Sequence, residues 1–193
     1  MKKYSKTLIL SSIIIILVLL NATLLYQNYQ LKKDKKDNIK EVVITKGSKL
    51  KYFSLKDIDG RNYTSENIIS ENDYTLFILF SLYDCPSCLM EKIVWEEIHK
   101  MNKVKVMGIV SHDDEIELKS WIENSNLSFT TLHDKNEKVT EFIKKQHNIN
   151  VTPLKILVAR SGEIVLINAS QQDPNRHREL ISIIDSEIQD YKY

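Results

Sequence analysis

The sequence predicts an α/β domain built on one central sheet with helices on both faces. Apolar runs typical of buried strands alternate with helical patterns through the middle of the chain, and the chain closes with a hairpin signal and one more helix. Alternation of this kind covers both faces of a single sheet. With 193 residues, 42% of them hydrophobic, the chain has room for one such domain and an appendage.

The stretch from Tyr74 to Met101 organises this domain. Residues 75–82 are uncharged and mostly apolar, which predicts a strand buried on both faces. A helix should follow directly, and Pro86 suits its first turn. We expect one apolar stripe on this helix, made by Met90, Ile93, Val94, Ile98 and Met101.

The chain's only two cysteines, Cys85 and Cys88, lie between this strand and this helix. The loop that they would close is too small to stabilise a fold. At a helix start, unpaired N–H groups and the helix dipole stabilise a thiolate. The position of Cys85 therefore predicts redox chemistry.

The remaining elements follow from turn and cap signals. Upstream we expect short strands in 42–44 and 50–55, and a short helix capped by Thr64 or Ser65. The downstream expectations are strands at 104–110 and 129–132, a helix at 115–123 capped by Asp113, a helix at 137–146, a hairpin of 154–159 with 163–167, and a last helix from Asp173-Pro174 to about Tyr191.

The N-terminal region divides into three segments ahead of the globular domain. Residues 1–6 are basic, 7–26 carry no charge and are long enough to span a bilayer, and 27–40 are a polar juxtamembrane linker. The globular domain is 41–193. A cleavable signal peptide is the competing interpretation of residues 7–26. The apolar stretch is long for a signal peptide, however, and no small-x-small cleavage site follows it, so we favour an uncleaved transmembrane anchor. Lysines flank both ends of this segment, so charge does not decide its orientation.

The charge balance argues against a nucleic-acid partner. The chain has 27 basic and 26 acidic residues, a formal net charge of +1, which gives no field that would attract DNA or RNA. A zinc site also lacks support, because there is no second cysteine pair and the five histidines are scattered. They are His99, His112, His133, His147 and His177.

The conjunction of Cys85-Pro-Ser-Cys88 with a later Thr152-Pro153 resembles the thioredoxin fold. The segment from Phe53 to Arg61 and the hairpin from Arg160 to Ile164 are similar to the redoxin group that includes the TlpA/ResA-type membrane-anchored thiol-disulfide oxidoreductases. The resemblance covers about residues 46–190. It implies a mixed central sheet with an N-terminal strand extension and a helix-strand insertion.

The resemblance also implies site residues and partners. Cys85 would be the nucleophile and Cys88 the resolving cysteine. Pro153 would follow a cis peptide bond, and Thr152 would offer its backbone to an incoming chain. No cofactor or metal is implied. The implied partners are protein thiol/disulfide clients, a membrane thiol electron donor, and the lipid bilayer through residues 7–26, with the catalytic domain on the extracytoplasmic side of the cell membrane.

Two positions depart from the family pattern. Asp84 stands where the family usually has an aromatic residue, and its carboxylate would oppose thiolate formation at Cys85. Leu79 stands where thioredoxins proper carry a buried acid. Asp84, Glu91 or water are therefore the candidates for proton handling, although Asp84 is equally well interpreted as a solvent-exposed loop residue or helix cap.

Four functions fit this pattern to different degrees. Reduction of exported proteins, for example in cytochrome c maturation, is favoured by the resemblance, and a thiol oxidase would use the same steps in reverse. A peroxiredoxin signature aligned on Cys85 would need Pro at Ile78 and Thr at Leu82, and neither is present. A copper or zinc chaperone of this fold typically has three residues between its cysteines and uses a distal histidine, whereas here two residues intervene.

Overall fold

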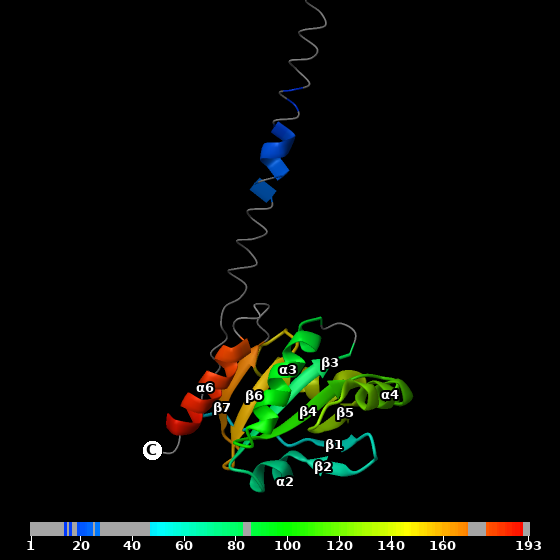
Figure 1. Cartoon of the computed structure of the whole chain (residues 1–193), viewed down its shortest axis with the longest axis vertical. Helices are drawn as coiled ribbons and strands as arrows, with labels where there is room; N and C mark the ends of the chain where they lie inside the picture. Colours follow the sequence, from blue (N-terminus) through cyan, green and yellow to red (C-terminus); the bar gives the residue numbers. More distant parts are fainter. Residues whose placement is uncertain are drawn as a thin grey trace, which may run out of the picture. The chain divides into compact units, whose positions relative to one another are not determined.

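The computed structural model describes residues 14, 16, 19–24, 26–27, 47–82, 86–169 and 177–190. The chain divides into two units, Met1–Glu41 and Val42–Tyr193. In the first unit the described residues are helical and exposed (Figure 1). Within the described part of the chain, no helix combines the length and the apolarity needed to cross a membrane. Most of the predicted anchor at 7–26 and of the linker at 27–40 lies outside the described residues, so both stay predictions.

The second unit is built on one seven-stranded sheet with strand order β2-β1-β5-β4-β3-β6-β7. Strands β3, β4 and β5 run parallel, and the other pairings are antiparallel, so the sheet is mixed as predicted. The strands are β1 (Ser54–Asp57), β2 (Asn62–Thr64), β3 (Tyr74–Ser81), β4 (Lys105–Ser111), β5 (Thr130–Asp134), β6 (Leu154–Ala159) and β7 (Ile164–Ala169).

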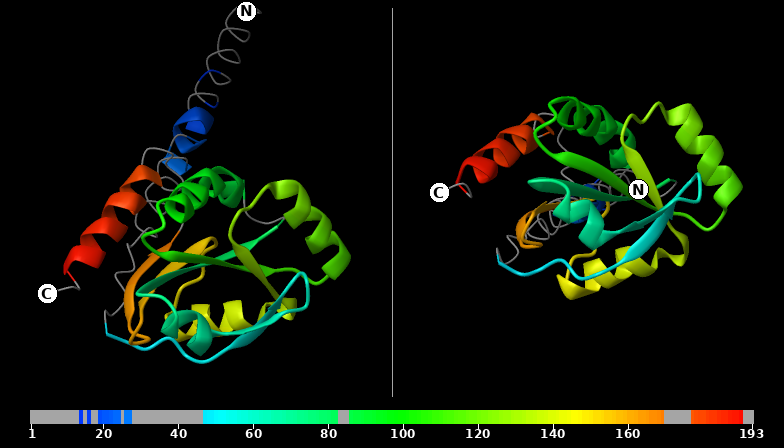
Figure 2. Two further views of the ribbon diagram at one scale, coloured as in Figure 1. Left: turned by 60° about the horizontal axis from the view of Figure 1, so that its bottom comes forward. Right: turned by 90° about the horizontal axis from the view of Figure 1, so that it is seen from below.

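Helices cover both faces of this sheet. Figure 2 shows α3, α4 and α6 on one side and α2 and α5 on the other. The helices are α2 (Ser65–Ser70), α3 (Pro86–Lys100), α4 (Glu115–Ser125), α5 (Lys138–Gln146) and α6 (His177–Asp190), with a short 3-10 helix at Lys135–Glu137 before α5. The hairpin of β6 and β7 and the helix-strand pair of α4 and β5 confirm the predicted order of elements.

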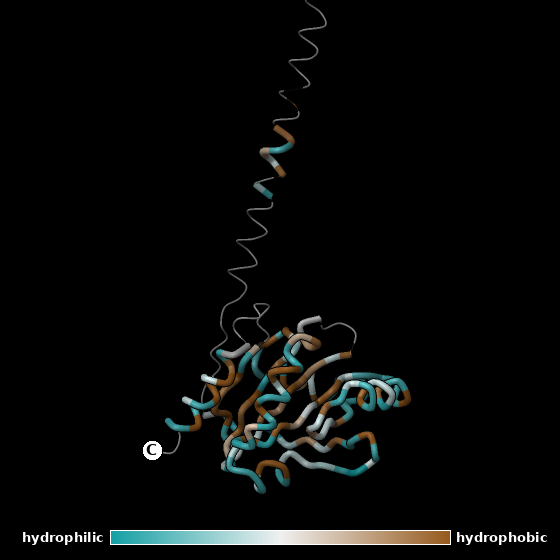
Figure 3. Tube along the Cα trace, viewed as in Figure 1, coloured by the Kyte–Doolittle hydropathy of each residue, from teal (hydrophilic) through white to brown (hydrophobic). Residues whose placement is uncertain are grey.

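Strand β3 is the centre of two apolar cores, one on each face. Its residues Leu76, Ile78 and Phe80 pack with residues of α3, including Trp95, whereas the alternate residue Phe77 packs on the other face with Ile143 of α5. Almost every residue of β3 is buried, as predicted for a strand covered on both sides. Figure 3 shows hydrophobic residues along the central strands and hydrophilic ones on the outer helices.

The predicted apolar stripe on α3 is wrong in part. Val94 and Ile98 are buried, but Met90 is 53% and Ile93 75% exposed. The buried face instead follows Cys88, Glu91, Val94, Trp95 and Ile98. A polar residue therefore occupies a core position of this helix, while three apolar residues near its start, Leu89, Met90 and Ile93, face solvent.

Smaller differences concern caps and boundaries. Asp114, not Asp113, caps α4: its carboxylate accepts hydrogen bonds from the N–H groups of Ile116 and Glu117. Thr64 caps α2, one of the two residues predicted. Instead of a strand over 50–55, the chain forms one isolated bridge at Lys49 and then β1 from Ser54. The predicted strand at 42–44 and the Asp173-Pro174 start of the last helix lie outside the described residues.

Candidate active site

Strand β3 and helix α3 deliver the cysteine motif to one edge of the sheet. β3 ends at Ser81, and α3 begins at Pro86. Cys88 lies in the first turn of α3, is 5% exposed and is disulfide-bonded. Cys85, the only other cysteine of the chain, and Asp84 lie outside the described residues. Because β4 and β5 run parallel to β3, their carboxyl ends meet at this same edge.

The loop before β6 reaches the same edge and contains a cis peptide bond between Thr152 and Pro153. β6 is antiparallel to β3, and its first residue, Leu154, pairs with Leu79 near the end of β3. The cis proline is thus one residue beyond the last paired position, beside the end of the strand that leads to the cysteines. The prediction of a cis bond at Pro153 is confirmed.

Helix α5 fixes this loop through a contact that sequence analysis did not identify. Nζ of Lys144 donates a hydrogen bond of 2.7 Å to Oγ1 of Thr152. Val151, the preceding residue, is 42% exposed. The side chain of Thr152 is therefore held by α5, whereas Val151 beside it is open to solvent.

Glu91 lies on the buried face of α3, three residues after Cys88, and is 1% exposed. Its Oε2 is 2.6 Å from Nζ of Lys155 on β6, and both side chains are 2% exposed. Burial lowers the pKa of Lys155, while the charge and hydrogen bond of Glu91 oppose that change. The proton-handling candidate Glu91 is therefore a buried partner of a lysine. The other candidate residue, Asp84, lies outside the described residues.

Sequence analysis missed Lys155, although one signal could have found it. Lys155 is the only charged residue in the apolar strand Leu154–Ala159. A charge in a strand that is buried on both faces requires a buried partner. The partner could not be identified from sequence, because Glu91 is 64 residues away and the predicted stripe of α3 did not include it.

Two histidines lie at the same sheet edge, after β4 and at the end of β5. Nε2 of His112 is 3.1 Å from Oε2 of Glu117, and Nε2 of His133 is 2.7 Å from the carbonyl oxygen of His112. Both rings are thus engaged within the fold. Among the residues that the structure describes, no group of three or more histidine, cysteine or carboxylate side chains is arranged to hold a metal ion.

A family model described as the AhpC/TSA family matches residues 46–167, which is more than half of the chain. The chain belongs to the AhpC/TSA family. The match spans the sheet from the segment before β1 to β7 and includes the motif helix and the cis-proline loop of this AhpC/TSA member. No protein with curated annotation matches the sequence at a significant level.

Solved structures confirm the thioredoxin-like fold of this AhpC/TSA protein. A secreted Mycobacterium tuberculosis disulfide oxidoreductase homologous to E. coli DsbE is 17% identical, with a TM-score of 0.57 over 69% of this chain and 95% of that one. The exposed lipoprotein thioredoxin Etrx1 of Streptococcus pneumoniae strain TIGR4 is 16% identical, with a TM-score of 0.56 over 72% and 99%. A thiol:disulfide interchange protein from Bacteroides sp. is 16% identical, with a TM-score of 0.58 over 74% and 91%.

Proposed function

We propose that this protein is a thiol-disulfide oxidoreductase that reduces disulfides of exported proteins through Cys85 and Cys88. One observation carries the proposal: a buried, disulfide-bonded Cys88 in the first turn of α3, at the sheet edge where the cis Thr152–Pro153 loop lies. The redoxin-type family and the thiol-disulfide exchange activity named for the structural relatives support it.

The first step uses Cys85 as the nucleophile. Its thiolate attacks one sulfur of a client disulfide, a new bond forms between that sulfur and Cys85, and the client's S–S bond breaks. The second client sulfur leaves as a thiolate and takes a proton from solvent. Exposed Val151 and half-buried Thr152 form the surface on which we expect the client segment to lie during this step.

The second step releases the client. Cys88 gives up its thiol proton and attacks the sulfur of Cys85, so that the intramolecular disulfide forms and the mixed disulfide breaks. The departing client thiolate is then protonated. In total the client gains two electrons and two protons, and the dithiol of the protein loses them. Glu91 is the described carboxylate nearest in sequence to Cys88 on the buried face of α3, and we assign it the role of accepting the Cys88 proton.

The experiment is a client-reduction assay with the full-length chain in mild detergent. Insulin serves as the disulfide substrate and dithiothreitol as the electron source. We expect the wild type to accelerate insulin reduction and C85S to abolish the acceleration. C88S, first reduced and then mixed with insulin after dithiothreitol is removed, should accumulate a mixed disulfide that added reducing agent cleaves. Wild-type protein that gives no more reduction than dithiothreitol alone, with no adduct from C88S, would contradict the proposal.

The reduction potential distinguishes a reductase from an oxidase. A potential near or below that of thioredoxin, about −270 mV, is expected for a reductase supplied with electrons by a membrane thiol donor. A potential near about −120 mV would instead indicate a protein that introduces disulfides. Two further measurements separate the other candidates: hydroperoxide consumption for a peroxidase, and metal content after purification without chelator for a copper or zinc chaperone.

We further propose that residues 7–26 anchor the protein in the cell membrane with the domain from residue 41 outside the cytoplasm. The support is the uncharged, apolar stretch of about the length that a bilayer requires. The test is fractionation: the protein should remain in the membrane pellet after alkaline extraction, and added protease should digest the domain in intact spheroplasts. A protein released by alkali, or protected in spheroplasts, would contradict the anchor or its orientation.

A further inference from the structure

Lys155 projects from the sheet toward the helix that carries the cysteines. It pairs with Ile78 of β3, and Ile78 belongs to the apolar core beneath α3. Leu157, two residues further along β6, belongs to that core as well. Because every second residue of a strand lies on the same face, Lys155 points to the same side as Leu157 and Ile78.

Glu91 meets Lys155 from α3, with 2.6 Å between Oε2 and Nζ. Residues three apart on a helix are neighbours, with their Cβ atoms about 5–6 Å apart. Glu91 and Cys88 have this spacing, and both are buried against the sheet. The ion pair therefore lies on the same buried face of α3 as Cys88, about one helical turn further along.

No other charge in the surrounding strands shares this environment. β3 and β7, the two neighbours of β6, carry no charged residue. On α3 the flanking charges are engaged elsewhere: Lys92 donates to the carbonyl oxygen of Ser125, and Glu96 accepts from N and Oγ of Ser128. Among the residues that the structure describes, Glu91 and Lys155 are thus the charged pair on the buried face of α3 that carries Cys88.

Stability does not account for this pair. Taking two charges out of water costs about as much as their attraction returns, and buried ion pairs can often be replaced by apolar residues of similar volume without loss. Removing only one partner, in contrast, leaves an uncompensated charge in the interior. Each of the two residues therefore depends on the other, and Glu91 is three residues from the redox cysteine Cys88 on the same helix face.

We propose that Lys155 is a positioning residue of the redox site, which holds the carboxylate of Glu91 beside the buried side of Cys88 and balances its charge. This inference rests on the proposed function, because it describes how the exchange reaction is tuned. With Lys155 present, the carboxylate is available to Cys88 without adding net negative charge to the site. Without it, the carboxylate would oppose formation of a thiolate.

The test is the pH dependence of the reduced cysteines in the full-length protein in detergent. The rate of alkylation by iodoacetamide reports thiolate formation and needs no client. Compared with wild type, Lys155→Met should raise the midpoint of this profile by about one pH unit, the effect of a nearby like charge. Glu91→Gln combined with Lys155→Met, which removes both charges, should return the midpoint to the wild-type value.

A matched control separates this effect from general damage to α3. Lys92→Met removes the neighbouring lysine on the same helix, whose contact is with Ser125, and should leave the midpoint unchanged. Thermal unfolding of every variant reports whether it is folded. A folded Lys155→Met variant with the wild-type midpoint would overturn the inference, as would a double variant shifted as far as the single one.

Two further arms keep the result decisive. If Lys155→Met does not fold, Glu91→Gln and the double variant are compared. Identical midpoints would overturn the inference, because Lys155 would then have no electrostatic effect on the cysteines.

Insulin reduction by the wild type is measured in parallel. Loss of that activity with the predicted alkylation shifts intact would count against the proposed function alone, whereas normal activity with unshifted midpoints would count against Lys155 alone.

Discussion

Nζ of Lys144 lies 2.7 Å from Oγ1 of Thr152, so a helix on one face of the sheet directly supports the loop that carries the cis proline. At its start the loop is also held by the hydrogen bond from the N–H of Ile149 to the carbonyl oxygen of Lys144 and by burial of Ile149 in the core. The contact also places the end of a lysine side chain beside the backbone that we expect a client to contact. Lys144 is therefore a residue whose loss should affect exchange more than folding.

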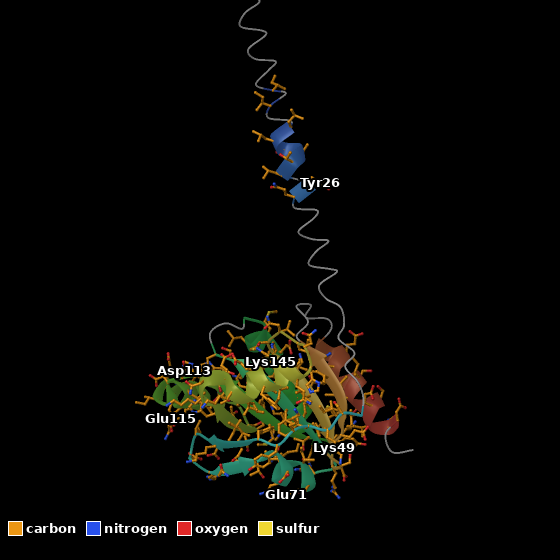
Figure 4. The ribbon with its side chains drawn as sticks, turned by 180° about the vertical axis from the view of Figure 1, so that it is seen from behind. Tyr26, Lys49, Glu71, Asp113, Glu115 and Lys145 are labelled. Atoms are coloured by element: carbon orange, nitrogen blue, oxygen red, sulfur yellow. The ribbon has the colours of Figure 1, made fainter. Side chains whose placement is uncertain are left out.

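Replacing Lys144 by Met should lower the kcat/KM for insulin reduction by about fivefold, since one hydrogen bond contributes about 1 kcal/mol. Lys145→Met is the matched control, because Lys145 is the exposed neighbour on the same helix (Figure 4). It should retain wild-type kcat/KM. Equal losses in both variants would show that the Thr152 contact has no specific role.

Replacing Trp95 by Ala should destabilise the domain strongly. Trp95 is 1% exposed, and its ring centroid is 5.3 Å from that of Phe80 on β3. Truncation of a buried tryptophan removes about 3–5 kcal/mol from the free energy of unfolding. Trp121 also contacts Phe80, at 5.9 Å, but is only partly buried, so Trp121→Ala should cost clearly less. Urea denaturation followed by circular dichroism measures both, and a larger loss for Trp121 would contradict the packing described.

Replacing Asp114 by Ala should lower the melting temperature at neutral pH but not in acid. Hydrogen bonds from the N–H groups of Glu117 and Ile116 lower the pKa of Asp114 below its ordinary value of 3.8. A carboxylate with a lowered pKa stabilises the folded state above that ordinary value and loses the effect as pH falls through the folded pKa. The gap between wild type and variant should therefore close below about pH 4. If the difference in melting temperature between wild type and Asp114→Ala persists in strong acid, it does not come from the charged form of the cap.

His147 should contribute to a loss of stability as pH falls below about 6.5. Burial, followed by the charge of Lys51, lowers the pKa of His147. The unfolded chain then binds a proton that the folded one does not, so stability decreases with falling pH until the folded pKa is reached. His147→Leu should flatten this part of the melting profile. An NMR titration midpoint of His147 at or above 6.5 in the folded protein would contradict this assignment.

The fold was predictable where apolar periodicity was unambiguous. The buried strand β3 and the hairpin of β6 and β7 follow directly from mostly apolar runs and a Gly162 turn. Asp114 was missed as a cap because two adjacent aspartates satisfy the same pattern, and only the backbone geometry distinguishes them. The extent of β1 was missed because a strand of four residues with only one buried position carries little hydrophobic signal.

The candidate site was predictable only in its local parts. Cys85, Cys88 and the cis bond at Pro153 follow from short motifs, and the cis bond is confirmed. The contacts of Lys144 and Lys155 join residues on different elements, so their partners depend on how the helices pack on the sheet. The exposure of Met90 and Ile93 has the same origin: the apolar residues of α3 satisfy more than one helical face, and packing selects the face that contains Glu91.

The two margins of the sheet limit how another polypeptide can associate with it. β2 is only three residues long, and the start of β7 is already occupied, since Ile164 donates to Ser48 and Leu50 donates to Gly162. Short or covered edge strands discourage the addition of a foreign strand. At β2 and at the start of β7, an incoming chain therefore finds little room for β-augmentation, so at these two places association would depend on a covalent adduct instead of on added strand pairing.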